Sequence, residues 1–332
     1  MKRHPPPKQA PKNRSVISPE GRDPSSPVVF APHSIPVGGG RTVVVRHVAS
    51  TDEAGLYQLY EGLDANDRYL RFFCPYRPTD EFIDKLANPG PGEARVVAEY
   101  LDGGKQLIAE AGYSLLDNGN GEFAMVVARD WRGWLGPYLL DVVIDIAAAN
   151  HVPNLEAEVL AANRTMLALL RARGSAFLEH DGWNEYRMMV GTGADGLRWP
   201  VGHNRPRVLV ETPTGRWHLE NSAQDAGMQV ITCAGPVHNP SCPALTGGEC
   251  ALVAEADAIV VRKRPDDPAW DRLTRSHSAT HPDIPVIVEP AGDQSRDTRL
   301  DVVRLPAFMH FYLRPSRDVD EQQSVPAGLL SG

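Results

Sequence analysis

Residues 122–174 alternate two apolar segments with two helical patterns, and a turn that contains glycine joins the first segment to the first helix. The apolar segment 122–128 predicts a strand, and the turn 129–136 leads into an amphipathic helix that begins at Leu135. Free backbone N–H groups and the helix dipole make the start of such a helix a binding site for phosphate oxygens. A second strand at 155–160 and a helix led by Asn163 follow. This order favours an α/β fold with an anion-binding turn.

The helix that begins at Leu135 has the clearest periodicity in the chain. Its apolar residues recur at the spacing of one buried helical stripe, and they are Leu135, Leu139, Val142, Val143, Ile146 and Ala147. Upstream, apolar runs predict strands at 42–48, 94–100 and 106–115. Capping patterns and periodicity predict helices at 50–63, 67–73 and 79–86. Weaker strand patterns at 176–179 and 186–190 complete a first domain, which covers residues 41–190.

The second half has its own alternation of strands and helices. Residues 191–206 are rich in Gly and Pro and predict a linker between domains. After it, strands are expected at 207–211, 228–233, 258–261, 284–288 and 300–305, with helices at 216–226, 249–256 and 267–276. Such an order predicts a parallel sheet covered on both faces, in a smaller domain over 207–313.

Composition limits the function. The chain has 332 residues and a formal net charge of -8, which argues against a broad nucleic-acid interface. No apolar run reaches the length of a membrane span, and no signal core opens the chain, so we expect a cytoplasmic protein with its four cysteines reduced. The basic, Pro-rich residues 1–40 and residues 314–332 are expected to form loose tails.

Four stretches of the first domain resemble the GNAT N-acetyltransferases, and most closely the bacterial protein-lysine acetyltransferases. They are residues 68–73 (Arg-Tyr-Leu-Arg-Phe-Phe), 122–124, 139–140 and 159–166. The resemblance covers residues 41–190 and implies a mixed sheet with flanking helices. It also implies transfer of an acyl group from acetyl-CoA or another acyl-CoA to an amine, either a small molecule or a protein lysine, by direct attack in a ternary complex.

The same resemblance implies a binding site for acyl-CoA. In the family, the end of the first strand pairs with pantetheine and the following turn holds the pyrophosphate. Aligned from Arg132, the turn has Leu135 and Pro137 where the family has glycines. A better local match deletes one residue, keeps Gly133 and Gly136 and lacks the middle glycine. Asn163 would lie beside pantetheine, and from its position alone it is a helix cap. The implied cofactor-binding residues are Met125, Val126, Val127, Arg132, Gly133, Trp134, Leu135, Gly136 and Asn163.

Glu122 is the candidate general base. The resemblance places it at the position of the family's base, which assists removal of the ammonium proton before attack. Independently, it opens an apolar strand, where partial burial would raise the pKa of a carboxylate. The alternative is an exposed carboxylate at the start of a strand. Glu156 and Glu158 alternate with apolar residues, and we expect both to be solvated.

The second domain resembles a response-regulator receiver, which is a flavodoxin-like fold. Only Glu211 is acidic at the strand ends where a receiver needs its acidic pair, its phosphoacceptor Asp and its Lys. The resemblance therefore implies a scaffold without phosphotransfer. It also leaves open a non-catalytic alternative for the whole chain, in which both domains serve regulation or interaction.

Cysteine and histidine residues gather in one loop-rich stretch of the second domain. Cys233, His238, Cys242 and Cys250 are suitable zinc ligands, although their spacing matches no established zinc motif. The alternatives are a buried Cys233 with two ordinary thiols, or a redox pair.

Overall fold

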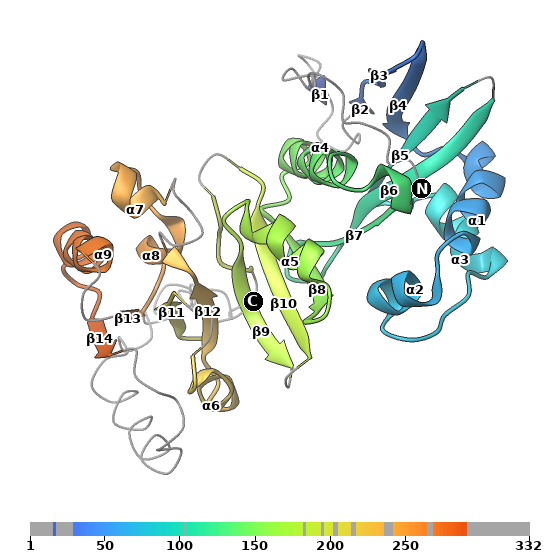
Figure 1. The fold of residues 1–332 in the computed structure, drawn as a ribbon. Helices are drawn as coiled ribbons and strands as arrows, with labels where there is room; N and C mark the ends of the chain where they lie inside the picture. The colour runs from blue at the N-terminus through green and yellow to red at the C-terminus, as the bar shows by residue number, and fades with distance from the viewer. Residues whose placement is uncertain are drawn as a thin grey trace, which may run out of the picture.

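The computed structural model describes residues 16–17, 29–102, 104–181, 184–193, 196–201, 205–213, 217–235, 242–263 and 268–290. Figure 1 shows these residues as strands flanked by helices. The strands are β1 (Val16–Ile17), β2 (Val29–Phe30), β3 (His33–Gly38), β4 (Arg41–His47), β5 (Glu93–Leu101), β6 (Lys105–Leu115), β7 (Gly121–Val127), β8 (Asn154–Leu160), β9 (Ala176–Asp181), β10 (Glu185–Gly191), β11 (Arg207–Glu211), β12 (Gln229–Cys233), β13 (Ala258–Lys263) and β14 (Val286–Pro290).

The helices agree with the predicted pattern in the first half and partly differ from it in the second. They are α1 (Glu53–Glu61), α2 (Ala65–Phe72), α3 (Asp80–Ala87), α4 (Leu135–Ala149), α5 (Arg164–Arg171), α6 (Glu220–Asp225), α7 (Pro243–Thr246), α8 (Ala251–Ala254) and α9 (Pro268–Thr280). In the second half α6 and α8 are shorter than predicted, α9 extends further, to Thr280, and α7 was not predicted. Short 3-10 turns at Ser50–Asp52 and Arg129–Trp131 precede α1 and α4. The predicted start of α4 at Leu135 is confirmed.

Twelve strands form one continuous mixed sheet, in the order β14-β13-β11-β12-β9-β10-β8-β7-β6-β5-β4-β3. Strands β3 to β7 are antiparallel neighbours, whereas β11 to β14 are parallel to one another. The two halves meet where β12 pairs antiparallel with β9 over Thr232–Phe177 and Cys233–Ala176. The order β12-β11-β13-β14 is the order of the first four strands of a flavodoxin-like sheet. The fifth strand, predicted at 300–305, lies outside the described residues.

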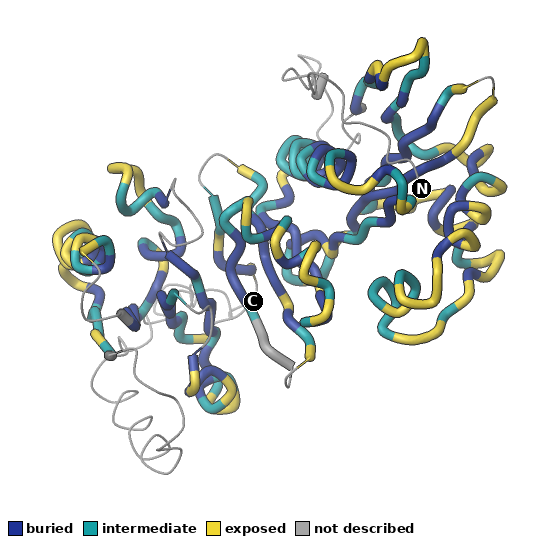
Figure 2. The backbone as a smooth tube through the Cα atoms, viewed as in Figure 1, coloured by how far each residue is buried: buried dark blue, intermediate teal, exposed yellow. Residues whose placement is uncertain are grey.

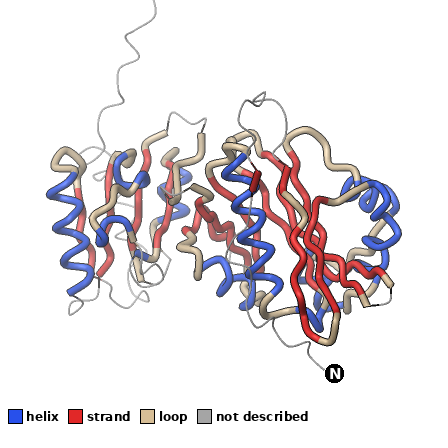
Figure 3. The backbone as a smooth tube through the Cα atoms, turned by 90° about the horizontal axis from the view of Figure 1, so that it is seen from above, coloured by secondary structure: helices blue, strands red, loops and turns tan. Residues whose placement is uncertain are grey.

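Helices cover both faces of the first half of the sheet (Figure 3). The core on one face lies beneath α4 and α5, where the predicted stripe from Leu135 to Ala147 is buried. On the other face, α1 and α3 pack against β5 and β6 through Leu56, Val97 and Leu107. Burial follows this layering, with the darkest segments along the strands (Figure 2). The arrangement leaves β7 and β8 at the centre of the chain's one long sheet.

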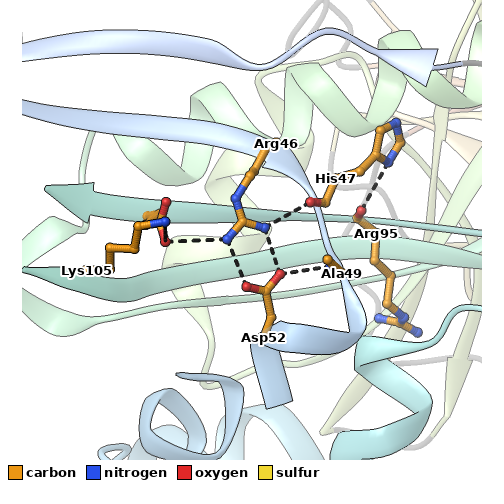
Figure 4. A network of polar contacts seen from close by, with 7 residues as sticks. Arg46, His47, Ala49, Asp52, Arg95 and Lys105 are labelled. Carbon is orange, nitrogen blue, oxygen red and sulfur yellow. Dashed lines mark hydrogen bonds and ion pairs between the residues drawn. The ribbon is translucent and has the colours of Figure 1, made fainter. Parts of the chain in front are cut away.

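A charged network fixes the start of α1 (Figure 4). Arg46 donates to both carboxylate oxygens of Asp52, at 2.7 and 2.8 Å, and the N–H of Ala49 donates to Asp52 at 2.8 Å. Burial alone would raise the pKa of Asp52, but these hydrogen bonds lower it overall. Arg46 also contacts Glu99 of β5 at 3.4 Å, so the network joins α1 to the sheet.

The folded part begins earlier than the sequence indicated. Residues 29–38 were expected in a loose tail, yet β3 pairs antiparallel with β4, and Phe30, Ile35 and Val37 are buried. The alternation of Ile35 and Val37 is short and follows a Pro-rich segment, which is why composition concealed it.

The predicted linker is also ordered where the structure describes it. Trp199 is 3% exposed, and its indole N–H donates to the carbonyl of Leu252 at 2.9 Å. It packs in the core of the second half together with Met189 of β10 and Leu209 of β11. Residues around 199 therefore pack in a core that includes residues of both halves, and the boundary between the two domains stays a prediction.

We expect Trp199→Ala to destabilise the protein by about 3–5 kcal/mol, because it opens a large cavity and leaves the carbonyl of Leu252 without its donor. The control is Tyr57→Ala on α1, whose side chain is 42% exposed and whose loss should cost less than about 1 kcal/mol. Urea unfolding followed by circular dichroism measures both. Equal losses for the two variants would contradict the packing described for Trp199.

Candidate active site

β7 and β8 pair over only two positions. They run parallel at Gly121–Leu155 and Glu122–Glu156, and no further pair forms between them although both strands are described in full. On their outer sides both strands are paired along their whole length, β7 with β6 and β8 with β10. The two strands therefore diverge beyond Glu122, and the backbone of residues 123–127 has an edge without a strand partner.

A cavity of about 610 Å³ lies in this divergence. Both strands, the turn after β7 and the starts of α4 and α5 contribute to its walls. It brings together seven of the nine residues predicted to bind the cofactor, namely Met125, Val126, Val127, Arg132, Gly133, Gly136 and Asn163. Trp134 and Leu135 do not line it: Trp134 packs against the core and Leu135 is fully buried there.

The turn after β7 has the backbone geometry that its glycines predicted. Gly133 has φ of 109°, a conformation that side chains disfavour. A Cβ on the buried Gly136 would meet only Cε of Met125, at 3.6 Å, which is an ordinary van der Waals contact, so a methyl group has room there. Pro137 is the third residue of α4, within the first turn, where an N–H has no acceptor inside the helix. The proline therefore costs the helix no hydrogen bond, and the N–H of Gly136, which lines the cavity, also has no acceptor inside the helix.

Arginines from this turn face the cavity and already have partners. Arg129 contacts Asp64 at 2.6 Å, and Arg132 contacts Asp67 at 2.8 Å, so both are tied to the start of α2. Nε of Arg132 also donates to the carbonyl of Val127 at 3.1 Å, which supplies one group of the strand edge with a partner. The pKa of Asp64 is lowered, first by the N–H of Asp67 and then by Arg129.

Of the four arginines in the cavity wall only Arg132 was predicted, and Arg129, Arg71 and Arg173 were not. Arg71 belongs to α2, and Arg173 follows α5, where it bonds Asp141 and the carbonyl of Pro137. The sequence pointed to residues 68–73 only as a motif. Nothing in residues 68–73 themselves indicates that Arg71 lies beside a cavity formed mostly by residues 50 to 100 positions later in the chain. The cavity wall contains four arginines and two carboxylates, Asp67 and Glu158, and this excess of guanidinium groups suits an anionic ligand.

Asn163 has the capping role predicted from its position. Its Oδ1 accepts from the N–H of Met166 at 3.2 Å and so caps α5. Because it also lines the cavity, its amide remains at the surface that a ligand would reach.

Glu122 lies at the last paired position of β7, where the strands begin to separate. It is exposed, so the partial burial expected of it does not occur. It faces a second cavity of about 430 Å³, which shares Ala157 and Glu158 with the first. Glu122 therefore stands next to the cavity of the diverging strands without lining it.

Glu156 was wrongly predicted to be solvated. It is 3% exposed, and its Oε1 accepts from the side-chain amides of Asn118 and Asn120 at 2.8 and 2.6 Å. β8 is a central strand with both faces largely covered, so alternation along it does not separate a wet face from a dry one. Glu158 is exposed as expected.

Three cysteines of the second half are near one another and near Glu211. Burial raises the pKa of Cys233, Cys242 and Cys250, to about 11 for Cys242, and the charge of Glu211 raises it further. Glu211 itself is buried and lies 2.8 Å from Nε2 of His277. His238 lies outside the described residues. Within the described ranges, no group of three or more His, Cys, Asp or Glu side chains is arranged to hold a metal ion.

Among the helices that the structure describes, none is long and apolar enough to cross a membrane.

No family model matches the chain. Among solved structures, the GNAT domain of S. lividans PAT is similar at 23% identity, over 48% of this chain and 95% of that one, with a TM-score of 0.43. The spermidine N-acetyltransferase of Vibrio cholerae, solved with CoA and spermine, is similar at 17% identity over 45% and 95%, with a TM-score of 0.38. The ribosomal-protein-S5-alanine acetyltransferase of Vibrio fischeri is similar at 16% identity over 47% and 94%, with a TM-score of 0.36. These matches span less than half of the present chain, at identities and scores too low to establish a shared activity.

The two glycines of the turn should respond differently to substitution. Gly133→Ala is expected to destabilise the protein by about 1–3 kcal/mol, because alanine disfavours φ of 109°. Gly136→Ala should change the stability by less than about 1 kcal/mol, since its Cβ has room and alanine favours a helix. Urea unfolding measures both variants. A loss at Gly136 as large as that at Gly133 would contradict the described turn.

Proposed function

We propose that the first half of the chain is an acyl-CoA-dependent N-acetyltransferase that uses acetyl-CoA or another acyl-CoA. The observation that carries this proposal is the divergence of β7 and β8 around a cavity that ends at the open N-terminus of α4. An acyl-CoA has an amide-containing arm and a pyrophosphate, and this cavity offers a free strand edge to the first and helix N–H groups to the second. The sequence resemblance to the GNAT enzymes supports the same assignment.

In this proposal, the free edge of residues 123–127 pairs with the amide groups of pantetheine. The N–H of Gly136, with the side chains of Arg129 and Arg132, meets the pyrophosphate. Arg129 and Arg132 would exchange Asp64 and Asp67 for phosphate oxygens, which form bidentate contacts with guanidinium groups as carboxylates do. Asn163 lies across the cavity on α5 and would contact the arm.

The reaction we propose is direct transfer in a ternary complex. Glu122 accepts a proton from the ammonium group of the acceptor, directly or through a water molecule, and the neutral nitrogen attacks the thioester carbonyl carbon. A backbone N–H of β7 stabilises the negative charge that develops on the carbonyl oxygen. The C–S bond then breaks, and the second proton of the nitrogen goes to the departing thiolate. The products are an amide and free CoA.

The position of Glu122 supports its role as base. It lies at the point where the strands separate, beside a cavity that touches the first one at Ala157 and Glu158. Because the carboxylate of Glu122 is exposed, an amine that binds at the surface can contact it directly. The alternative interpretation is that Glu122 is an exposed carboxylate with no chemical role. It agrees with the exposure but does not explain why Glu122 lies where the strands separate.

A second candidate function is regulation or interaction without catalysis. The observation in its favour is that Arg129, Arg132 and the carbonyl of Val127 have partners within the chain, so the polar groups of the cavity are partly occupied. For the second half, we propose a receiver-like scaffold, because Glu211 is paired with His277 where a receiver would present free carboxylates. A soft-metal site that includes His238 stays a prediction.

Titration calorimetry with acetyl-CoA tests the binding site. We expect a dissociation constant between about 1 and 100 micromolar for the wild-type protein. Gly136→Val should weaken binding by at least about tenfold, because its side chain would enter the cavity that Gly136 lines. The matched control is Gly104→Val, where a Cβ meets nothing and no cavity is near. No binding at millimolar acetyl-CoA would reject the enzyme and favour the regulatory function.

Removal of the base should separate turnover from affinity. Glu122→Gln is expected to lower kcat by about 100-fold or more, because glutamine cannot accept the ammonium proton. The affinity for acetyl-CoA should stay within about twofold, since Glu122 does not line that cavity. Release of the CoA thiol measures the rate, and Glu81→Gln on the exposed face of α3 is the control. A kcat that stays unchanged in Glu122→Gln would remove this residue from the mechanism.

A further inference from the structure

The second half of the chain contains a cluster of three thiols that the proposed reaction does not use. Cys233, Cys242 and Cys250 pack in or against one core, and none of them lines either of the two cavities described above. Cys74, the fourth cysteine, is exposed after α2 and lies outside that core. All four cysteines are free thiols in this structure. The cluster is therefore a group of reduced nucleophiles that is separate from the site of the first half.

Cys242 and Cys250 bracket a compact loop. Cys242 comes directly before α7, and Cys250 comes directly before α8. Between them the chain turns at Gly247, which has φ of 82°, and the N–H of Gly248 donates to the carbonyl of Pro243 at 2.9 Å. A Cβ placed on Gly248 would lie 3.4 Å from Cβ of Pro243. The neighbour of one cysteine thus contacts a residue two positions before the other, so the loop folds back and brings its two ends toward each other.

The three thiols also influence one another electrostatically. Burial, followed by the charges of Glu211 and Cys250, raises the pKa of Cys242 to about 11. Burial also raises the pKa of Cys233, and the charges of Glu211, Cys250 and Cys242 add to the increase. Such charge effects fall with distance, so the thiols lie near one another. A disulfide has no charge, so its formation does not leave a thiolate beside the buried carboxylate of Glu211.

Cys233 is held more rigidly than the other two cysteines. It is the last residue of β12, where it pairs with both β9 and β11, and its sulfur accepts from the N–H of Gly235 at 3.3 Å. A disulfide requires two Cα atoms about 4.4–6.8 Å apart and a specific dihedral angle. The loop between Cys242 and Cys250 contains two adjacent glycines and can adjust to this requirement, whereas a strand between two partners resists a shift. Cys242 and Cys250 are therefore the favoured pair.

We propose that Cys242 and Cys250 form a reversible disulfide when the protein meets a disulfide oxidant such as oxidised glutathione. Cys250 is half-buried and Cys242 is buried, so the oxidant reaches Cys250 first. The thiolate of Cys250 attacks one sulfur of the oxidant, and the first glutathione leaves as a thiolate. The thiolate of Cys242 then attacks the sulfur of Cys250 and releases the second glutathione. The protein loses two electrons and two protons, and the two glutathione molecules leave with those protons as thiols.

The disulfide would also affect the segment that joins the two halves. Cys250 precedes α8, and two residues later the carbonyl of Leu252 accepts the indole N–H of Trp199 at 2.9 Å. The N–H of Val201 donates to the carbonyl of Asn118, and both of these residues line the second cavity. A shift of α8 on oxidation would move Trp199 and this wall of the cavity. We therefore expect oxidation to change the rate of transfer, a consequence that rests on the proposed function, whereas the disulfide does not.

Proteolysis after alkylation identifies the cysteines that pair. The whole protein is equilibrated in buffers with different ratios of oxidised to reduced glutathione, its remaining thiols are blocked with iodoacetamide, and the chain is cleaved after glutamate. Cleavage after Glu249 separates Cys250 from Cys242, so a disulfide between them joins two peptides that mass spectrometry detects. In the most oxidising buffer, the alkylated fraction of both cysteines should fall by at least about tenfold, and dithiothreitol should restore it.

Variants separate this pair from the alternatives. The peptide that contains Cys242 also contains Cys233, so the joined peptides should persist in Cys233→Ser and disappear in Cys242→Ser. Cys250→Ser is a second variant if Cys242→Ser fails to fold, because Cys250 is only half-buried. The control is Cys74→Ser, which should leave the joined peptides unchanged because Cys74 is exposed elsewhere. Cys250 bound to glutathione alone, or joined peptides that require Cys233, would overturn the proposal.

Rates for oxidised and reduced protein test the connection to the first half. After removal of glutathione, the rate of CoA release from acetyl-CoA should differ by at least about fivefold between the two forms, and Cys250→Ser should show a single rate. A disulfide that forms with no change in rate rejects this connection and leaves the pair in place. A disulfide in a protein that does not bind acetyl-CoA rejects the proposed function alone. An active enzyme in which no disulfide forms rejects this inference alone.

Discussion

The pairing of β7 with β8 stops after Glu122 and Glu156, and the rest of the site depends on that stop. Each strand is held along its outer side, by β6 and by β10, so the sheet stays continuous while its centre opens. An open strand edge in the middle of a sheet leaves backbone groups without partners, which is unfavourable unless something else bonds them. Arg132 bonds one of them, the carbonyl of Val127, from the turn that also begins α4. The divergence thus creates the cavity, the free edge and the need for a partner at once.

Charge divides the two sides of this opening. Arginines from α2, the turn after β7 and the end of α5 outnumber the carboxylates of Asp67 and Glu158 on one side. Carboxylates of β7, β8 and the turn between β6 and β7 outnumber the single guanidinium group of Arg187 on the other. Glu158 lines both cavities, so the boundary falls on β8. A reaction between an anionic thioester and a cationic amine needs such a division, because each reagent is repelled from the other's site and both are brought to one boundary. Within each cavity the like charges repel one another, and a ligand of opposite charge relieves that repulsion.

Local sequence signals predicted the parts of the site that form within a few residues. The stripe from Leu135, the capping Asn163 and the glycines of the turn depend on neighbours along the chain, and each has the expected form. Glu156 was misjudged because alternation along a strand says nothing about a wall brought from elsewhere, here Asn118 and Asn120. Trp199 was misjudged for the same reason, since a Gly- and Pro-rich segment conceals an anchor in a core formed by distant strands. Arg71 and Arg173 reach the cavity only through the tertiary fold.

The segment that connects the two halves contributes to the second cavity, which Glu122 and Glu156 also line. Val201 lines that cavity, and its N–H donates to the carbonyl of Asn118 at 3.1 Å. Two residues earlier, Trp199 is fixed in the core of the second half, and Arg198 exchanges backbone hydrogen bonds with Asn154. The segment between the halves therefore supports Glu156 through Asn154 and Asn120, and it anchors the second half through one indole ring. If the second half moved relative to β9 and β10, this segment would move with it. The hydrogen bonds of Asn154 and Asn120, which hold the carboxylate of Glu156, would change first. The second cavity is thus lined by residues of the first half and by Val201 of the segment between the halves, whereas the arginine-lined cavity belongs to the first half alone.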